Sequence, residues 1–317
     1  MTPDDYPHPN PPPHAGEGAR LKIRHSPSPS PAGEGGSGWG STNAVRGTAE
    51  IGFAVRDGAT RLAHLYERNP LRVLFPQPVA EDAALAVLVT TSGGLVAGDQ
   101  IDIAVETGPH AIAHVTGSAA EKIYRSTGAT TQVKQRLAAE AGAWFEFLPP
   151  ETILFDRARL RRNTRVKLAL DAGFLGGGII VFGRIAMGER FSAGLLHEGW
   201  EVRRRDALIW GDALHVAGDV AAIMSDPACF AGAEACATLI LAPRDGDPRR
   251  FVDSAREAQM RSAADGLRTG VTAVNGLLVA RWLGDAVPLR RAYAELACHL
   301  RAEAMGLPPR LPRLWHV

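Results

Sequence analysis

Charged and polar side chains that interrupt apolar stretches are the residues of this chain with the clearest capacity for chemistry. A charge among apolar residues is costly unless it is paired or reaches water, so each such position needs a structural or functional reason. The set comprises Asp99 in a Gly-rich turn, the cluster Glu121, Lys122, Tyr124 and Arg125, the pair Arg184 and Glu189, and Asp212 between two apolar segments.

Two interpretations of this set stay open from the residues alone. The first is a network of internal salt bridges, for instance between Arg184 and Glu189. The second is a polar passage, or a groove that faces a partner. Asp99 has a further explanation, because an aspartate that follows a glycine in a turn commonly hydrogen-bonds nearby backbone.

Patterns typical of tight metal sites and of covalent catalysis are absent from the sequence. The cysteines form no Cys-x-x-Cys motif. His110 and His114 fall in a predicted strand, where residues four apart lie about 13 Å apart and cannot share one ion. There is no Gly-x-Ser-x-Gly motif and no Gly-x-x-x-x-Gly-Lys phosphate loop, and the glycines after Ser92 are better explained by a turn.

Length and charge argue against several classes of protein. The 317 residues suffice for one large domain or two small ones. Lys plus Arg is 35 and Asp plus Glu is 34, so no overall field favours nucleic acid or an anionic membrane. No apolar run approaches the roughly 20 residues that span a bilayer, and no hydrophobic signal core opens the chain. We expect a cytoplasmic protein with reduced cysteines.

Short strands separated by turns dominate the chain from Ile51 to about residue 245. Apolar and polar residues alternate over 101–106 and 131–137, and Asp57-Gly58 predicts a hairpin. Helical periodicity is nearly absent here, which argues against a doubly wound α/β sheet. We predict a mainly β protein of the α+β class, with either a wound, β-helical architecture or stacked antiparallel sheets.

Two helices are predicted near the C-terminus. Residues 247–266 carry small and apolar side chains at helical spacing. A second stripe runs from Leu289 to Leu300 at positions i, i+4, i+7 and i+11, and Gly306 ends it. A predicted strand over 277–283 separates these helices.

The first 45 residues differ in composition from the rest of the chain. They are rich in Pro, Gly, Ser and His, and they cannot bury enough apolar surface to offset the entropy of ordering. We expect a disordered extension over 1–45. Residues 46–317 then form one domain, mostly β to about 245 and helix-containing over 246–317.

Four motifs follow one another along the chain: TSGGLVAGD (91–99), AAEKIYRS (119–126), FLPPETILFD (147–156) and VFGRIAMGE (181–189). None of them is specific by itself, but in this order and at these intervals they closely resemble one known family, the UreD (also called UreH) urease accessory proteins. Together with the ending Pro-Arg-Leu-Trp, they extend the resemblance from about Gly52 to Trp315.

The resemblance implies a chaperone rather than an enzyme. Proteins of this family act with UreF, and through UreF with the GTPase UreG, to place nickel in apo-urease. Their fold is mostly β, wound or β-helical, with a few helices. The resemblance implies no tightly bound cofactor, because GTP belongs to UreG and nickel is in transit. A dimer within the accessory complex is a further expectation.

The resemblance also implies an internal water-filled tunnel for nickel. Gly176-Gly177-Gly178 departs from the family's more polar pattern and has no carboxylate, which argues against ion handling at that point. A cation in transit should meet oxygen ligands and water rather than a closed Cys and His site. By position in the motifs, the candidates for nickel passage are Asp99, Glu121, Glu189 and Asp212, and the structural or tunnel candidates are Lys122, Tyr124, Arg125 and Arg184.

Two alternatives to nickel conduction stay open. A scaffold that remodels urease without conducting metal would use partner surfaces but no polar path. An unrecognised enzyme on a β fold would show turnover without UreF and UreG.

Overall fold

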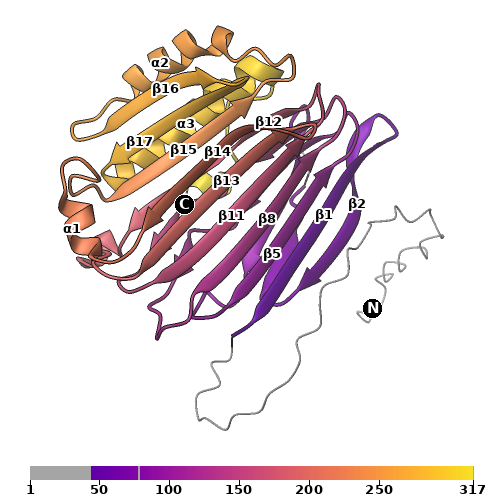
Figure 1. Ribbon diagram of the computed structural model, residues 1–317. Helices are drawn as coiled ribbons and strands as arrows, with labels where there is room; N and C mark the ends of the chain where they lie inside the picture. The colour runs from indigo at the N-terminus through magenta and orange to yellow at the C-terminus, as the bar shows by residue number, and fades with distance from the viewer. Residues whose placement is uncertain (1–43, 78, 317) are drawn as a thin grey trace, which may run out of the picture. The chain divides into compact units, whose positions relative to one another are not determined.

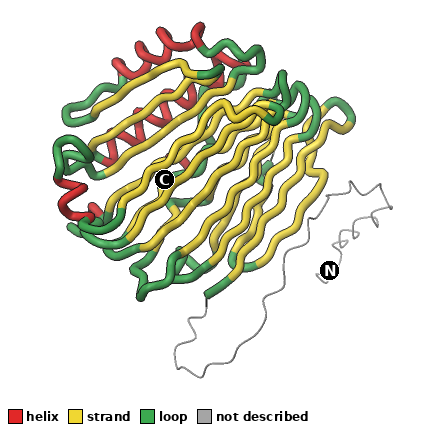
Figure 2. The backbone as a smooth tube through the Cα atoms, in the orientation of Figure 1, coloured by secondary structure: helices red, strands yellow, loops and turns green. Residues whose placement is uncertain are grey.

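The structure is a computed structural model and describes residues 44–77 and 79–316. This part of the chain folds into two β-sheets and a helical layer (Figures 1 and 2). Our expectation of a disordered extension over 1–45 lies, except for its last two residues, outside the described residues. The seven-stranded first sheet, called sheet A, has the order β14 (Ala207–Val216), β13 (Leu195–Arg204), β11 (Arg159–Leu168), β8 (Thr131–Ala139), β5 (Gln100–Thr107), β1 (Arg46–Arg56) and β2 (Ala59–Arg68).

The second sheet, called sheet B, has ten strands and packs behind sheet A in the view of Figure 1. Two of its strands, β10 (Thr152–Leu154) and β7 (Glu121–Ile123), branch from the end of its longest member. The main path runs β16 (Arg268–Val274), β17 (Leu277–Gly284), β15 (Ala235–Ala242), β12 (Gly173–Phe182), β9 (Trp144–Phe147), β6 (Ile112–Gly117), β4 (Ala84–Thr90) and β3 (Leu71–Leu74).

The chain winds between the two sheets. It passes from β4 in sheet B to β5 in sheet A, returns to β6, and continues in the same alternation through β8, β9, β11, β12 and β13. Successive coils therefore place parallel strands beside one another, β5-β8-β11-β13 in sheet A and β4-β6-β9-β12 in sheet B. The predicted mainly β fold is confirmed, in its wound form.

Two of the antiparallel strand pairs are hairpins with two-residue turns, β1–β2 and β16–β17. Asp57 and Gly58 both have positive φ, 51° and 73°, in the turn between β1 and β2. Asn275 and Gly276 do the same, at 47° and 81°, between β16 and β17. Positive φ at both central residues is the geometry that twisted two-residue hairpins require. The predicted hairpin at Asp57-Gly58 is confirmed.

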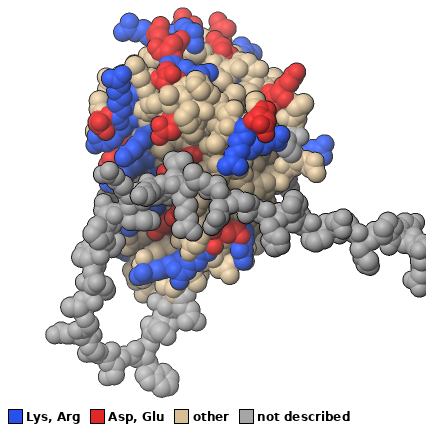
Figure 3. Space-filling model, turned by 90° about the vertical axis from the view of Figure 1, so that its right-hand side faces the viewer, with Lys and Arg blue, Asp and Glu red and all other residues tan. Residues whose placement is uncertain are grey.

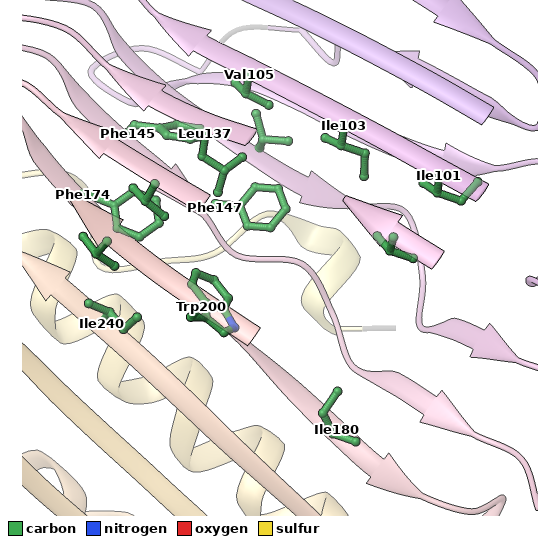
Figure 4. Packing of buried hydrophobic residues seen from close by; sticks show 14 of the residues in the cluster. Ile101, Ile103, Val105, Leu137, Phe145, Phe147, Phe174, Ile180, Trp200 and Ile240 are labelled. Carbon is green, nitrogen blue, oxygen red and sulfur yellow. The ribbon is translucent and has the colours of Figure 1, made fainter. Parts of the chain in front are cut away.

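An apolar core fills the space between the sheets (Figure 4). Along β5 the buried residues Ile101, Ile103 and Val105 alternate with partly exposed ones, as their period-2 pattern predicts. From sheet B, Phe145 and Phe174 pack against each other with ring centres 5.8 Å apart. This core fixes the separation of the sheets, and with it the space in which interior polar groups lie.

The outer face of sheet B is covered by α2 (Val252–Arg261) and α3 (Ala286–Met305). The predicted stripe from Leu289 to Leu300 is buried, and Gly306 ends α3 with a φ of 66°. The two C-terminal helices are thus confirmed, although α2 is shorter than the predicted 247–266. A helix that the sequence did not predict, α1 (Val220–Ser225), follows β14, and the 3-10 turns are η1 (Ile185–Met187), η2 (Arg249–Phe251) and η3 (Arg313–His316).

A buried charge network ties α3 to sheet B. Arg301 of α3 donates to the Glu146 carboxylate at 3.0 Å and to Asp82 at 2.6 Å, and its second amino group donates to two backbone carbonyls beyond the helix. His114 lies 2.9 Å from the same carboxylate. We expected His110 and His114 on one strand; instead His110 has a φ of 57° and lies in the turn before β6. His114 serves this anchor.

Candidate functional site

An interior cavity of about 160 Å³ lies between the sheets, beside β7. Sheet A contributes Gln135 and Arg162 to its wall, and β7 contributes Glu121 and Lys122. Gly94 belongs to the wall as well, and a side chain there would collide with Tyr124 and with the backbone of Lys122. The predicted role of these glycines in a turn is confirmed, since Gly93 and Gly94 both have positive φ.

Glu121 is the carboxylate in the wall of this cavity. Thr90 of β4 donates a hydrogen bond to it at 2.5 Å. Burial raises the pKa of Glu121, and the bonds from Thr90 and the Lys122 backbone together with the charge of Arg162 offset only part of that rise. A group of this kind takes up a proton more readily than a solvated carboxylate does.

Arg162 and Glu198 form an ion pair deeper between the sheets. The parallel register of β11 and β13 places the two residues opposite each other, on the inward face with Leu160 and Leu196. Arg162 Nε donates to Glu198 at 2.6 Å, and its Nη1 donates to Thr152 at 2.8 Å. Burial raises the pKa of Glu198, and Arg162 opposes this rise. The pair is a charged group in a largely apolar layer.

A second space, a groove of about 360 Å³, opens where β14 and β17 face each other. Arg281 donates to Asp212 across it at 2.6 Å. Cys236 lies in the groove wall, near enough to Glu198 and Arg281 to be influenced by both charges. Burial raises the pKa of Cys236 to about 12, so its thiol keeps the proton and is a poor metal ligand at neutral pH.

These groups form a sequence of polar side chains from the cavity to the groove. Gly178 of β12 leaves room in this sequence, because an added Cβ there meets only Arg162, at 3.9 Å. Thr238, the partner of Gly178 on β15, lines the groove. We call the set the interior polar row; its members are Glu121, Arg162, Glu198, Cys236, Arg281 and Asp212.

Comparison with known proteins identifies the family. The family described as UreD urease accessory protein matches residues 45–316. A protein named urease accessory protein UreD from Magnetococcus marinus is 44% identical over 281 residues, which cover 87% of this chain and 96% of that protein. The chain belongs to the UreD family. A UreD from Azorhizobium caulinodans is 41% identical over 272 residues, 85% of this chain and 95% of the relative.

Membership of the UreD family places the chain in urease maturation. Proteins of this family are accessory chaperones for nickel insertion and are not catalytic. In the described part of the chain, no helix is long and apolar enough to cross a membrane. The same residues contain no group of three or more His, Cys, Asp or Glu side chains able to hold a metal ion.

Of the four residues that the UreD resemblance suggested for nickel passage, two line the spaces described above, each a different one. Glu121 and Asp212 lie at the two ends of the interior polar row. Asp99 does not line either space; it is buried in the turn before β5, where its carboxylate accepts the backbone N–H groups of Val45 at 2.9 Å and Val96 at 2.8 Å. That is the turn role which the sequence also allowed.

Glu189 and Arg184 form a separate corner beside η1. They make the ion pair that the sequence suggested, with Arg184 Nη2 2.5 Å from the carboxylate. The other oxygen of Glu189 accepts the backbone N–H of Asp156 at 2.9 Å, and Arg184 stacks over Phe155 at 4.6 Å. Hydrogen bonds from Arg184 lower the pKa of Glu189, so this carboxylate stays charged and occupied.

The remaining polar candidates lie at the surface side of the same corner. Tyr124 donates to the Gly93 carbonyl at 3.0 Å and packs edge-on against Phe155. Lys122 is exposed at the wall of the cavity, and Arg125 is exposed with a single backbone bridge. On the face shown in Figure 3, Lys and Arg side chains and Asp and Glu side chains are interspersed with uncharged surface.

Sequence reasoning missed the middle of the interior polar row, Arg162 and Glu198. The sequence did contain a signal for them. Glu198 lies on the same face of its strand as the apolar Leu196 and Val202, and Arg162 lies on the same face as Leu160. Charges at inward positions of a strand are unusual and need partners. The pairing itself was not readable, because it depends on the parallel register between two strands 36 residues apart.

Proposed function

We propose that nickel on its way to apo-urease passes through this protein between the interior cavity and the β14–β17 groove. The interior polar row supports this proposal more than any other observation, because it supplies oxygen ligands at intervals through an otherwise apolar layer. Glu121 and Glu198 are the carboxylates of this row nearest the cavity, and Asp212 is the carboxylate at the groove.

Arg162 sets a condition on this transfer. Its guanidinium occupies the carboxylate of Glu198 and repels another cation, so it must swing away while nickel passes. Gly178 offers the space for such a movement. In this proposal Glu121, Glu198 and Asp212 are the ligands in transit, whereas Asp99 and Glu189 act structurally, since backbone groups and Arg184 already occupy their oxygens.

The partners in this proposal are UreF, the GTPase UreG reached through UreF, and apo-urease. We further propose that the protein acts in the cytoplasm, as part of a complex that can contain two copies of this chain. Residues 46–317 would form the functional domain, with the extension over 1–45 dispensable for it. GTP hydrolysis belongs to UreG, and no resident cofactor is needed in this chain.

A scaffold that remodels urease without conducting metal is the competing function, and one observation favours it. The edge strand β2 and the adjoining β3 expose large apolar side chains, Leu62, Leu65, Tyr66, Leu74 and Phe75. An exposed apolar edge of this kind is a surface that a partner protein covers. Both functions need such a surface, but only conduction needs the interior polar row.

The substitution Glu198→Gln tests conduction against scaffolding. Glutamine keeps the shape of the side chain and removes its charge, so complexes with UreF, UreG and urease should still form. We expect urease activation by nickel, bicarbonate and GTP to fall by about tenfold, as when a metal path loses a supporting group. The matched control is Glu201→Gln, on the outward face of the same strand, which should activate normally. Normal activation by the Glu198→Gln complex would support the scaffold.

A further inference from the structure

Two histidines lie side by side on the outer face of sheet A, away from the interior polar row. His197 of β13 and His215 of β14 are direct antiparallel partners, and their ring centres are 5.6 Å apart. His215 is exposed and His197 is half-buried. In the view of Figure 1 the outer face of these strands is turned toward the reader, while α2 and α3 pack against sheet B.

The separation of the rings matches two imidazoles that share one metal ion. A histidine nitrogen binds nickel-like or zinc-like ions at about 2.0–2.1 Å, which puts the ring centre about 3.2 Å from the ion. Two rings around a tetrahedral ion then have centres about 5 Å apart. The observed distance needs only a small rotation of the side chains to reach this value. A cross-strand pair holds both rings on a rigid support.

A third donor lies beside the pair. Gly199, two residues along β13, has no side chain, and the position of a Cβ there would be 3.3 Å from His197 Nε2 and 2.8 Å from Asn163 Oδ1. An imidazole nitrogen and an amide oxygen therefore approach the same point above the Gly199 backbone, where a side chain would be crowded. Asn163 belongs to β11 and is the ladder partner of Gly199. Three strands contribute one donor each, and the absence of a side chain at Gly199 lets two of these donors lie close together.

We infer that His197 and His215, with Asn163 beside them, form a surface site for a divalent transition cation such as Ni²⁺. Imidazole nitrogens suit nickel, copper and zinc, and two of them with one amide oxygen leave coordination positions open to water or to a partner's side chain. Such a site binds the cation reversibly and does not store it. It is separate from the proposed interior passage, and its occupancy does not depend on whether nickel travels inside the protein.

Arg161 is the charge that opposes this site. It is the ladder partner of His197 on β11 and lies on the same outer face. Its positive charge weakens the binding of any cation there, by an amount that depends on salt. Removing a ligand should weaken cation binding, whereas removing Arg161 should strengthen it. If the two histidines only pack against each other, the cation affinity should not change when Arg161 is removed.

Calorimetric titration of the full chain with NiCl₂ tests the site. We expect His197→Ala and His215→Ala each to weaken this binding step by at least about tenfold, and Arg161→Ala to strengthen it several-fold at low salt. His64→Ala is the matched control, because His64 is an exposed histidine at the opposite edge of the same sheet, and it should leave the step unchanged. Melting curves check that each variant is folded.

Two results would overturn the inference. One is nickel binding that is the same in the two histidine variants and in the His64→Ala control, which would mean that the rings only pack on each other. The other is an Arg161→Ala protein whose nickel affinity is unchanged at low salt. Neither measurement involves urease, so both stay informative even if the interior passage proves to be wrong.

Discussion

Glu146 carries a negative charge at a position that solvent does not reach. Burial alone would raise its pKa, but the hydrogen bond and charge of His114 and the guanidinium of Arg301 lower it to about 2. The indole of Trp144 donates to the same carboxylate at 3.0 Å. Every polar partner that this charge needs is thus supplied by the sheet and by α3, which makes it a strong but conditional anchor.

The anchor should make folding sensitive to acid. Because the pKa of Glu146 is lower in the folded protein than its usual 4.5, its stabilisation is complete above that value and is lost as the pH falls toward about 2. We expect a contribution of about 3 kcal/mol at neutral pH. Urea unfolding of the Glu146→Gln variant should show this loss at neutral pH and a flatter dependence on acid.

The exposed Glu201→Gln variant provides the control for that experiment, since its carboxylate lies on the outer face of sheet A. It should unfold like the unmodified protein at every pH. Parallel pH profiles for the Glu146→Gln variant and the unmodified protein would contradict the role given to Glu146.

The sequence could indicate a candidate site residue only where its neighbours along the chain made it stand out. Glu121 and Asp212 stand out because each interrupts an apolar segment, and both lie in the interior polar row. Asp99 and Glu189 stood out equally, yet their oxygens are used by backbone groups and by Arg184. Which charges meet in space depends on strand register, and a single sequence does not contain it.

Strand β12 carries three successive glycines with different surroundings. A Cβ on Gly177 would collide with the carbonyl oxygen of Thr238 on the neighbouring strand, whereas one on Gly178 would meet only the end of Arg162, at 3.9 Å. Glycine is therefore required at position 177, because the neighbouring backbone leaves no room for a Cβ. At position 178 glycine leaves interior space.

The two glycines should respond differently to the same substitution. Gly177→Ala forces the backbones of β12 and β15 apart, and we expect a loss of about 2–3 kcal/mol in the free energy of unfolding. Gly178→Ala should change it by less than about 1 kcal/mol, because alanine suits a strand at least as well as glycine. Equal losses in a urea titration of the two variants would refute this assignment of the contacts.

Strands and helices were largely predictable from periodicity. The alternation along β5 and β8, the Asp57-Gly58 hairpin and the stripe of α3 all appear where the pattern indicated. Helix α1 was missed because six residues are too short for a periodic signal. The choice between stacked antiparallel sheets and a wound fold was also beyond the residues alone, since both bury the same alternating side chains.

The winding of the chain explains why a polar row can exist inside an apolar protein. Each coil adds one strand to each sheet, and inward positions of neighbouring coils fall in register across the layer. A charge on one coil then finds its partner on the next, as Arg162 finds Glu198. Such a row costs stability, because a buried ion pair is seldom better than an apolar pair of the same volume. The proposed conduction of a cation would give that cost a reason.

Blocking the interior polar row at Gly178 tests whether nickel passes along it. Gly178→Leu places an apolar side chain beside Arg162, on the proposed path from the cavity to the groove, and Gly178→Ala is its control. The measurement is the nickel content of urease after incubation of each complete accessory complex with apo-urease, nickel, bicarbonate and GTP. We expect intact complexes for both variants, with nickel transfer largely lost for leucine and retained for alanine. Normal nickel loading by an intact Gly178→Leu complex would contradict the interior passage.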